Sequence, residues 1–237
     1  MIFIPSYKRP KNCKAAKLLG KAVICCHSGE VAEYKKNNSN EIMEIPDKLA
    51  GKGMGVIRNW ILKKSPDDDV MMVDDDVSVV GYFDNKIKMK MSERQIYRFI
   101  ENGFRMVKGI GSVLWGVNLL EDKKAYREYS PFSLSSVVLG CFMGIVRNDL
   151  KFDEGLGLKE DFDYSIQVLN KYRKVLRFNK YHYIVDHLVG SGGCTAYRTL
   201  SKERQQKKIF IKKWGSGIVK FEEKDMNPIV RVPIAGI

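Results

Sequence analysis

Two kinds of apolar segment alternate along the first third of the chain. Continuous apolar runs are typical of strands buried on both faces of a sheet, and they cover residues 1–5, 21–26, 41–46 and 70–73. Segments with apolar residues every three or four positions predict helices, and they cover residues 13–19, 31–34 and 56–62. Strands and helices that alternate with short loops predict an α/β fold with a mixed, mostly parallel central sheet flanked by helices.

Further helices and strands are predicted in the rest of the chain. Ser92 is a typical N-cap for a helix over about 93–108, which has one apolar face. Another helix is predicted to begin near Glu160, because Phe162 and Ile166 lie four positions apart and share a face. The remaining predicted elements are a strand at 111–117, a strand or tight strand pair at 137–146, and a helix at 201–213.

The chain shows no internal repeat, no low-complexity tract and no linker-like segment. We therefore expect a single domain. Residues 1–200 are expected to form the body of that domain, and residues 201–237 a basic C-terminal helix and tail that pack on it.

Three consecutive acids, Asp74, Asp75 and Asp76, directly follow the apolar run at 70–73. Adjacent carboxylates at a strand end repel one another unless a cation neutralises them. In an open α/β sheet, ligands bind at the carboxyl ends of the strands. We therefore predict that Asp74 and Asp76 hold a divalent metal, which in turn holds a phosphate-bearing substrate. The alternative is an acidic turn exposed to solvent.

Two later segments carry further candidate groups. Glu160 and Asp161 lie in the first turn of a predicted helix, where the helix dipole favours an ionised carboxylate that can act as a general base. The alternative for this pair is ordinary capping of the helix start. His187 follows an acid and precedes the glycine-rich segment 190–193, so it is a candidate metal ligand beside backbone N–H groups that can face a phosphate. The alternative for His187 is a structural histidine.

The chain is strongly basic, with 41 Lys and Arg against 28 Asp and Glu and a formal net charge of +13. Such a charge indicates a polyanionic partner, with nucleic acid the first candidate and a membrane surface the second, although solubility explains part of the excess. In the helix predicted at 201–213, phosphate contacts are expected from Lys202, Arg204, Lys207 and Lys208. The alternative is a solvated helix face.

Cysteine usage and local motifs limit the class of protein. The five cysteines form no Cys-x-x-Cys pair, so neither a disulfide framework nor a zinc ribbon is indicated, and reduced thiols of the cytoplasm are expected. The glycines at 51–55 match neither a dinucleotide-binding fingerprint nor a P-loop. The N-terminus lacks the charge pattern of a signal peptide, and no apolar segment approaches the roughly 20 residues that span a bilayer. We therefore expect a soluble, cytoplasmic protein without a membrane partner.

The order of the motifs resembles that of GT-A glycosyltransferases, which transfer a sugar from a nucleotide-sugar donor. The similarity covers about residues 1–195 and rests on the strand end at 5–10, on Arg58-Asn59, on the acidic triplet 74–76, on Glu160-Asp161 and on His187. The small size, the basic charge and the Asp-His segment followed by glycines are more particularly similar to the TET-associated glycosyltransferases. Those are phage and related enzymes linked to glycosylation of hydroxymethylated DNA bases, so the expected location becomes the host cytoplasm if the chain is phage-encoded.

The resemblance implies a role for each matching residue. Tyr7 and Arg9 would lie near the nucleoside of the donor and Arg58 near its diphosphate. The acidic triplet resembles the DxD motif, in which Asp76 would bind Mn²⁺ or Mg²⁺ directly while Asp74 approaches the ribose or the water shell of the metal. The remaining implied roles are donor binding by Asp75, Gly192 and Gly193, metal ligation by His187, and general-base catalysis by Asp161 with Glu160 beside it. The middle acid, Asp75, departs from the pattern and leaves open which two acids serve the metal.

The expected function is therefore a metal-dependent, inverting transfer from a UDP-sugar to 5-hydroxymethylcytosine in DNA. Three alternatives stay open. The acceptor could be a glycan, a lipid head group or a protein; the acids could form a two-metal nucleotidyltransferase or nuclease site; or the chain could bind nucleic acid without catalysis. The residues themselves predict neither the sugar, the nucleotide base of the donor, the inverting or retaining outcome, the identity of the acceptor nor the oligomeric state.

Overall fold

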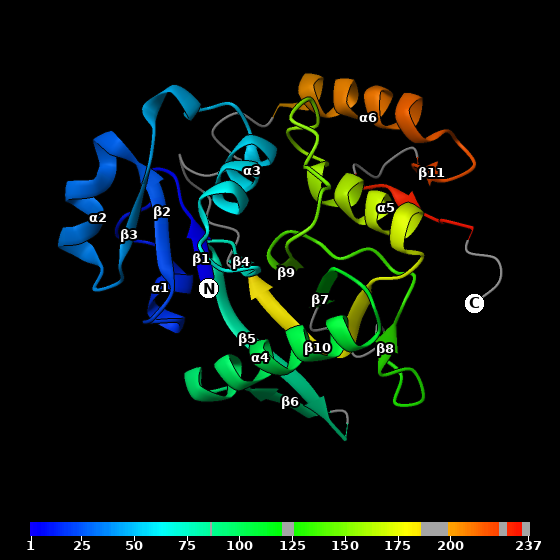
Figure 1. Ribbon diagram of the computed structural model, residues 1–237, viewed down its shortest axis with the longest axis horizontal. Helices are drawn as coiled ribbons and strands as arrows, with labels where there is room; N and C mark the ends of the chain where they lie inside the picture. Colours follow the sequence, from blue (N-terminus) through cyan, green and yellow to red (C-terminus); the bar gives the residue numbers. More distant parts are fainter. Residues whose placement is uncertain (86, 120–125, 186–198, 223–226, 234–237) are drawn as a thin grey trace.

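A ten-stranded mixed sheet forms the centre of the protein in the computed structural model, which describes residues 1–85, 87–119, 126–185, 199–222 and 227–233 (Figure 1). The strands lie in the order β3 (Ile42–Ile45), β2 (Val23–His27), β1 (Ile2–Pro5), β4 (Asp69–Val73), β9 (Phe142–Val146), β7 (Leu114–Asn118), β10 (Leu176–Val185), β5 (Val77–Asp84) and β6 (Ile87–Lys90). A short strand, β8 (Phe132–Ser133), pairs with β10.

Parallel pairing joins β3, β2, β1 and β4, whereas β9 runs antiparallel between β4 and β7. Because β1, β2 and β4 run in the same direction, their carboxyl ends meet at one edge of the sheet. The residues that follow Pro5, His27 and Val73 therefore lie close together, as an α/β ligand site requires.

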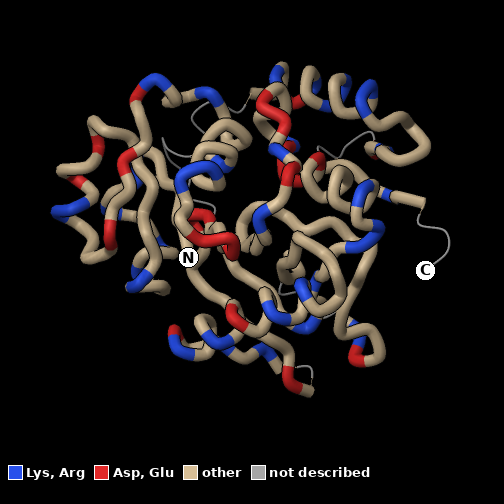
Figure 2. The backbone as a smooth tube through the Cα atoms, in the orientation of Figure 1, with Lys and Arg blue, Asp and Glu red and all other residues tan. Residues whose placement is uncertain are grey.

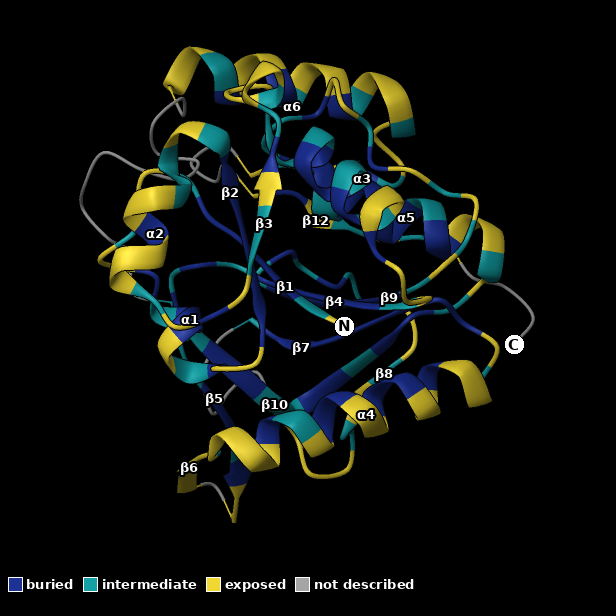
Figure 3. Ribbon diagram, turned by 60° about the vertical axis from the view of Figure 1, so that its left-hand side comes forward, coloured by how far each residue is buried: buried dark blue, intermediate teal, exposed yellow. Residues whose placement is uncertain are grey.

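Helices cover both faces of the sheet (Figures 1 and 3). One face packs against α1 (Lys14–Leu18), α2 (Val31–Asn37) and α4 (Glu93–Gly109), and the other against α3 (Met54–Lys64) and α5 (Glu160–Tyr172). Strand β4 serves both cores, because Met71 and Val73 point to the first face while Val70 and Met72 point to the second. The mixed sheet flanked by helices that the sequence predicted is thus confirmed.

A C-terminal layer lies on the outer side of α5. Helix α6 (Leu200–Trp214) packs there through Phe210 against Phe162 and Ile166, together with Val219 of a small antiparallel sheet. That sheet consists of β11 (Val219–Lys220) and β12 (Ile229–Val230). Among the helices formed by the described residues, none has the length and apolar character needed to cross a bilayer.

Most predicted elements are present close to their expected bounds. The hydroxyl of Ser92 accepts a hydrogen bond from the backbone N–H of Gln95 in a capping box, which explains the clear start of α4. The segment 137–146 forms a strand only from Phe142, and the preceding residues run as a loop toward the strand ends. Gly140 and Gly144 in this segment predict a close approach, and Cβ atoms at these positions would overlap Arg58 and Trp115 respectively.

The sequence reasoning missed the hairpin of β5 and β6 and the long strand β10. All four residues of β6 are exposed, so the strand has no apolar period to detect. It pairs with β5 at the sheet edge, where Lys88 and Lys90 discourage pairing with another chain.

Candidate active site

A cavity of about 290 Å³ opens at the carboxyl ends of β1, β2 and β4. We call it the strand-end pocket. Its lining joins the loop after β1, the acids after β4, the start of α3 and the start of α5. The predicted site residues that line it are Tyr7, Arg9, Arg58, Asp74, Asp75, Asp76, Glu160 and Asp161. The predicted ligands His187, Gly192 and Gly193 lie outside the described residues.

Asp75 anchors the loop that follows β1. Its carboxylate is buried and accepts hydrogen bonds from the Ser6 hydroxyl at 2.6 Å and from the Arg9 guanidinium at 2.8 Å. Its backbone carbonyl accepts from the N–H groups of Lys14 and Ala15 at the start of α1. Both carboxylate oxygens thus already have partners, which points to a structural role for the middle acid.

Asp74 is paired with Arg58 from α3. The Arg58 guanidinium is only 2% exposed, and it lies 3.1 Å from Asp74 Oδ1 and 3.2 Å from the carbonyl oxygen of Gly140. The same guanidinium lies 3.6 Å from Glu160. Arg58 therefore links the acids of two elements, and its predicted contact with a donor diphosphate stays a prediction.

Within the acidic triplet, Asp76 has a buried carboxylate oxygen that lacks a hydrogen-bond partner among the described residues. Its Oδ1 is buried and makes no hydrogen bond within the described part of the chain, while its Oδ2 lies 3.8 Å from Arg9. Burial, together with the charges of Asp74 and Asp75, raises the pKa of Asp76 to about 7. A buried oxygen without a partner, in a cluster with excess negative charge, fits a bound cation.

The two acids at the start of α5 differ in their surroundings. Glu160 is buried against Arg58, and burial together with the neighbouring Asp161 raises its pKa. Asp161 is less buried and accepts hydrogen bonds from the backbone N–H of Gly140 at 3.0 Å and of Phe162 at 2.8 Å. These two donors fix the Asp161 carboxylate at the pocket wall, where a general base must be held rigidly.

The chain matches a known protein family over most of its length. Residues 1–193 match the family model described as TET-Associated Glycosyltransferase. The chain belongs to that family. The family predicted from the order of the motifs is thereby confirmed, although no curated protein matches the chain.

Solved structures similar to this TET-associated glycosyltransferase show the fold. Glucosyl-3-phosphoglycerate synthase from Mycobacterium tuberculosis in complex with Mg²⁺ and uridine diphosphate (UDP) matches 97% of this chain and 86% of its own at 9% identity, with a TM-score of 0.53. S. aureus TarS 1-349 matches at 13% identity and a TM-score of 0.45, over 76% of this chain and 59% of its own. The chain thus spans less than two thirds of TarS 1-349, and the likeness to the synthase confirms the GT-A-type fold.

Three residues of the strand-end pocket were not predicted from the sequence as site residues. The His27 ring packs edge-on against Tyr7 at 5.4 Å between centroids, and Ser6 bridges Asp75 and the Tyr34 hydroxyl. Cys141 follows Gly140, and its backbone carbonyl accepts from the N–H of Asp74 at 3.1 Å. Ser6 and His27 stand at strand ends, which is the one sequence signal that indicates them.

In this TET-associated glycosyltransferase, α6 lies beyond the matched residues and holds the loop before α5. The Lys159 ammonium, 1% exposed, lies 3.1 Å from the Glu203 carboxylate, which is 4% exposed. Near the other end of α6, Lys213 pairs with Asp153 at 2.6 Å and with Asp163 at 2.8 Å. Two ion-pair anchors therefore fix the segment that carries Glu160 and Asp161, and we call this arrangement the α6 clamp.

Breaking the inner anchor is expected to cost much stability. Lys159→Met leaves the buried Glu203 carboxylate without this cation, so we expect the free energy of unfolding to fall by about 3–5 kcal/mol in urea denaturation. Lys108→Met is the matched control, because the Lys108–Asp69 pair has a similar distance of 2.7 Å but is exposed, and it should cost less than about 1 kcal/mol. Equal losses for the two variants would contradict the assignment of the anchor.

The predicted phosphate contacts of α6 stay a prediction. Arg204 and Lys208 are exposed, whereas the Lys207 ammonium lies 4.8 Å from the centre of the Phe221 ring. Lys202 is half-buried in the first turn. Figure 2 shows Lys and Arg along most elements of the protein rather than on α6 alone, so α6 does not stand out as the basic surface.

Proposed function

We propose that this protein is a metal-dependent glycosyltransferase that binds a UDP-sugar in the strand-end pocket. The observation that carries the proposal is the buried Oδ1 of Asp76, which lacks a partner among the described residues and belongs to the same cavity as Asp161. An acid of this kind supports cation binding, and a second, oriented carboxylate supports proton transfer. The similar synthase structures contain UDP with Mg²⁺ or Mn²⁺, which supports the same ligands here.

Asp76, with Asp74 beside it, would hold Mn²⁺ or Mg²⁺, and His187 would be a further ligand. Within the described residues no group of three or more His, Cys, Asp or Glu side chains could hold a metal alone. That arrangement suits a cation that one or two carboxylates share with substrate phosphates. When bound, the cation stabilises the negative charge that develops on the leaving diphosphate.

Asp161 takes the proton from the acceptor hydroxyl as that oxygen attacks the anomeric carbon. The new bond joins the acceptor oxygen to the anomeric carbon, while the bond from that carbon to the diphosphate oxygen breaks and its electron pair leaves with UDP. Attack from the face opposite the diphosphate inverts the anomeric centre. Tyr7, Arg9, Gly192 and Gly193 would contact the donor, and Asp75 would act indirectly by holding the loop that carries Tyr7 and Arg9.

The proposed acceptor is 5-hydroxymethylcytosine in DNA, and a glycan or protein acceptor is the alternative. The formal net charge of +13 supports a polyanion, and membership of the TET-associated glycosyltransferases supports the DNA-base acceptor that the resemblance in the sequence implied. A base in a duplex must leave the stack to reach the pocket, and cationic surface must hold the flanking phosphates.

Donor binding tests the proposal first. At a UDP-sugar concentration about 100 times its Kd, with Mn²⁺ present, we expect the melting temperature to rise by about 5–10 °C. EDTA should remove both this shift and the slow hydrolysis of the donor. If no nucleotide-sugar shifts the melting temperature or is hydrolysed, the proposal is wrong. Mass spectrometry of hydroxymethylcytosine-containing DNA after incubation then tests the acceptor.

A further inference from the structure

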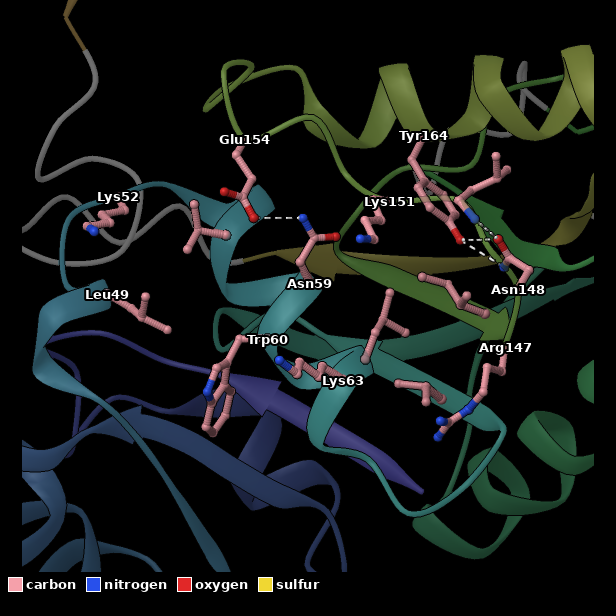
Figure 4. A pocket seen from close by; sticks show the side chains of 15 residues that line it. Leu49, Lys52, Asn59, Trp60, Lys63, Arg147, Asn148, Lys151, Glu154 and Tyr164 are labelled. Atoms are coloured by element: carbon pink, nitrogen blue, oxygen red, sulfur yellow. Dashed lines mark hydrogen bonds between the residues drawn. The ribbon is translucent and has the colours of Figure 1, made fainter.

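A second and larger cavity, of about 640 Å³, lies between α3 and α5 (Figure 4). We call it the α3 groove. Helix α3 separates it from the strand-end pocket, because Ile57 and Arg58 line that pocket while Asn59, Trp60 and Lys63 line the groove. The two cavities therefore share one helix as a common wall.

The groove lies over β4 and β9, whose side chains at this place are buried beneath it. Its floor is formed by Val70 of β4 and Ile145 of β9. One wall is fixed by Asn59, whose amide donates to the carbonyl oxygen of Phe152 at 2.9 Å and to Glu154 at 3.1 Å. These hydrogen bonds hold the helix and the loop that form this wall of the groove in place.

The rim of the groove is strongly basic. Four cations line it, and its one acid is Glu154, which already accepts from Asn59; the cations are Lys52, Lys63, Arg147 and Lys151. Arg147 is paired with Asp68 at 2.7 Å. The three lysine side chains make no ion pair or hydrogen bond with the described residues. Such a rim complements a ligand with several negative charges.

A partly exposed aromatic side chain, Trp60, lies beside these cations. Trp60 and Lys63 lie three positions apart and project from the same side of α3 (Figure 4). Trp60 is half-buried, so part of its indole is available to a ligand. Tyr164, across the groove, is fully buried and stacks on Phe152, so Trp60 is the aromatic side chain that a ligand can reach. Cations beside an open aromatic ring are typical of grooves that bind nucleic-acid strands, because bases stack on the ring.

We propose that the α3 groove binds a strand of the nucleic-acid acceptor, with its phosphates on Lys52, Lys63 and Lys151 and a base against Trp60. The 11 residues of α3 span about 16 Å, which matches about five nucleotides stacked as in B-form DNA, where the rise along the axis is about 3.4 Å each. Lys52 lies between Gly51 and Gly53, which line the strand-end pocket. A strand in the groove would therefore lead toward that pocket. The inference rests on the proposed DNA acceptor and gives it a location.

Charge reversal in the groove tests this location. The groove variant carries two substitutions, Lys63→Glu and Lys151→Glu. The control variant carries Lys35→Glu and Lys36→Glu, which replace two exposed lysines on α2 and lower the net charge by the same amount. Fluorescence anisotropy with hydroxymethylcytosine-containing DNA should show about tenfold or more weaker binding for the groove variant. For the groove variant, the plot of the logarithm of the DNA-binding constant against the logarithm of the salt concentration should become less steep by about 1.4–1.8, because two phosphate contacts are lost. Trp60→Ala should weaken binding by about fivefold or more.

Three results would overturn the location. The first is an unchanged affinity for DNA in the groove variants. The second is a loss of DNA affinity in the α2 control that equals the loss in the groove variant. The third is that the groove variants lose binding to phosphatidylserine vesicles but keep their binding to DNA. Hydrolysis of a UDP-sugar without DNA is measured in parallel and should be unchanged in every variant. If the unmodified protein hydrolyses no UDP-sugar, the proposed function is contradicted. The anisotropy comparison would still decide whether the groove binds DNA.

Discussion

Asp76→Asn is expected to lower the rate of sugar transfer by about 1,000-fold or more, because a bound cation contributes several kcal/mol to stabilising the charge on the leaving diphosphate. Asparagine keeps the shape of the side chain but loses the charge that attracts the cation. Transfer is measured with a UDP-sugar across a Mn²⁺ titration, and cation binding by calorimetry. The variant should lose both the activity and its dependence on Mn²⁺.

The fold should survive this change. Asp76 Oδ1 has no partner within the described chain, and burial, together with the charges of Asp74 and Asp75, raises the pKa of Asp76 and so disfavours its ionised form. We therefore expect the melting temperature of Asp76→Asn to be equal to or above that of the unmodified protein in the absence of metal. Activity that remains sensitive to EDTA in this variant would contradict the assignment of Asp76.

Asp75→Asn is the matched control, since it changes the neighbouring acid in the same way. It replaces one of the oxygens that accept from Ser6 and Arg9, so it should lower the free energy of unfolding by about 1–3 kcal/mol. Metal affinity should change less than in Asp76→Asn. The comparison separates an acid that holds the loop from an acid that holds the cation.

Asp161→Asn is expected to slow transfer by about 100- to 10,000-fold, which is the usual contribution of a general base. The amide oxygen can still accept from the N–H of Gly140 or Phe162, so the pocket should keep its shape. The thermal shift caused by a UDP-sugar with Mn²⁺ should therefore be nearly unchanged. Transfer at the normal rate would show that Asp161 is not the base.

Asp163→Asn gives the control for that experiment. This acid is fully buried on the same helix turn and accepts from Lys213 and from the indole N–H of Trp214, both on α6. Its replacement should lower stability through the α6 clamp. At temperatures where the variant is folded, it should transfer sugar faster than Asp161→Asn.

The sequence predicted the site better than it predicted the supporting contacts. The acids at 74–76 and at 160–161 stand directly after a strand and at a helix start, so local pattern places them at one edge of the sheet. The different partners of Asp74, Asp75 and Asp76 depend on Arg58, Ser6 and Arg9, which are distant in sequence. Pattern along the chain contains no signal for such pairings.

The same limit applies to α6. Its apolar and basic residues predicted a helix and, from charge, a phosphate surface. The burial of Glu203 against Lys159 follows from how α6 crosses α5, which no periodicity in either helix encodes. Helix α6, which the sequence indicated as a basic surface, therefore also supports the start of α5 through contacts between residues distant in sequence.

The α6 clamp also bears on how this chain can be divided for expression. The family match ends at residue 193, but Leu156, Phe162 and Ile166 are covered by Phe210 and Val219 beyond that point. A protein that stops at residue 193 would expose this apolar surface to solvent along with the ammonium of Lys159. The boundary of the recognisable family is therefore not a boundary at which the chain can be cut without exposing part of its core.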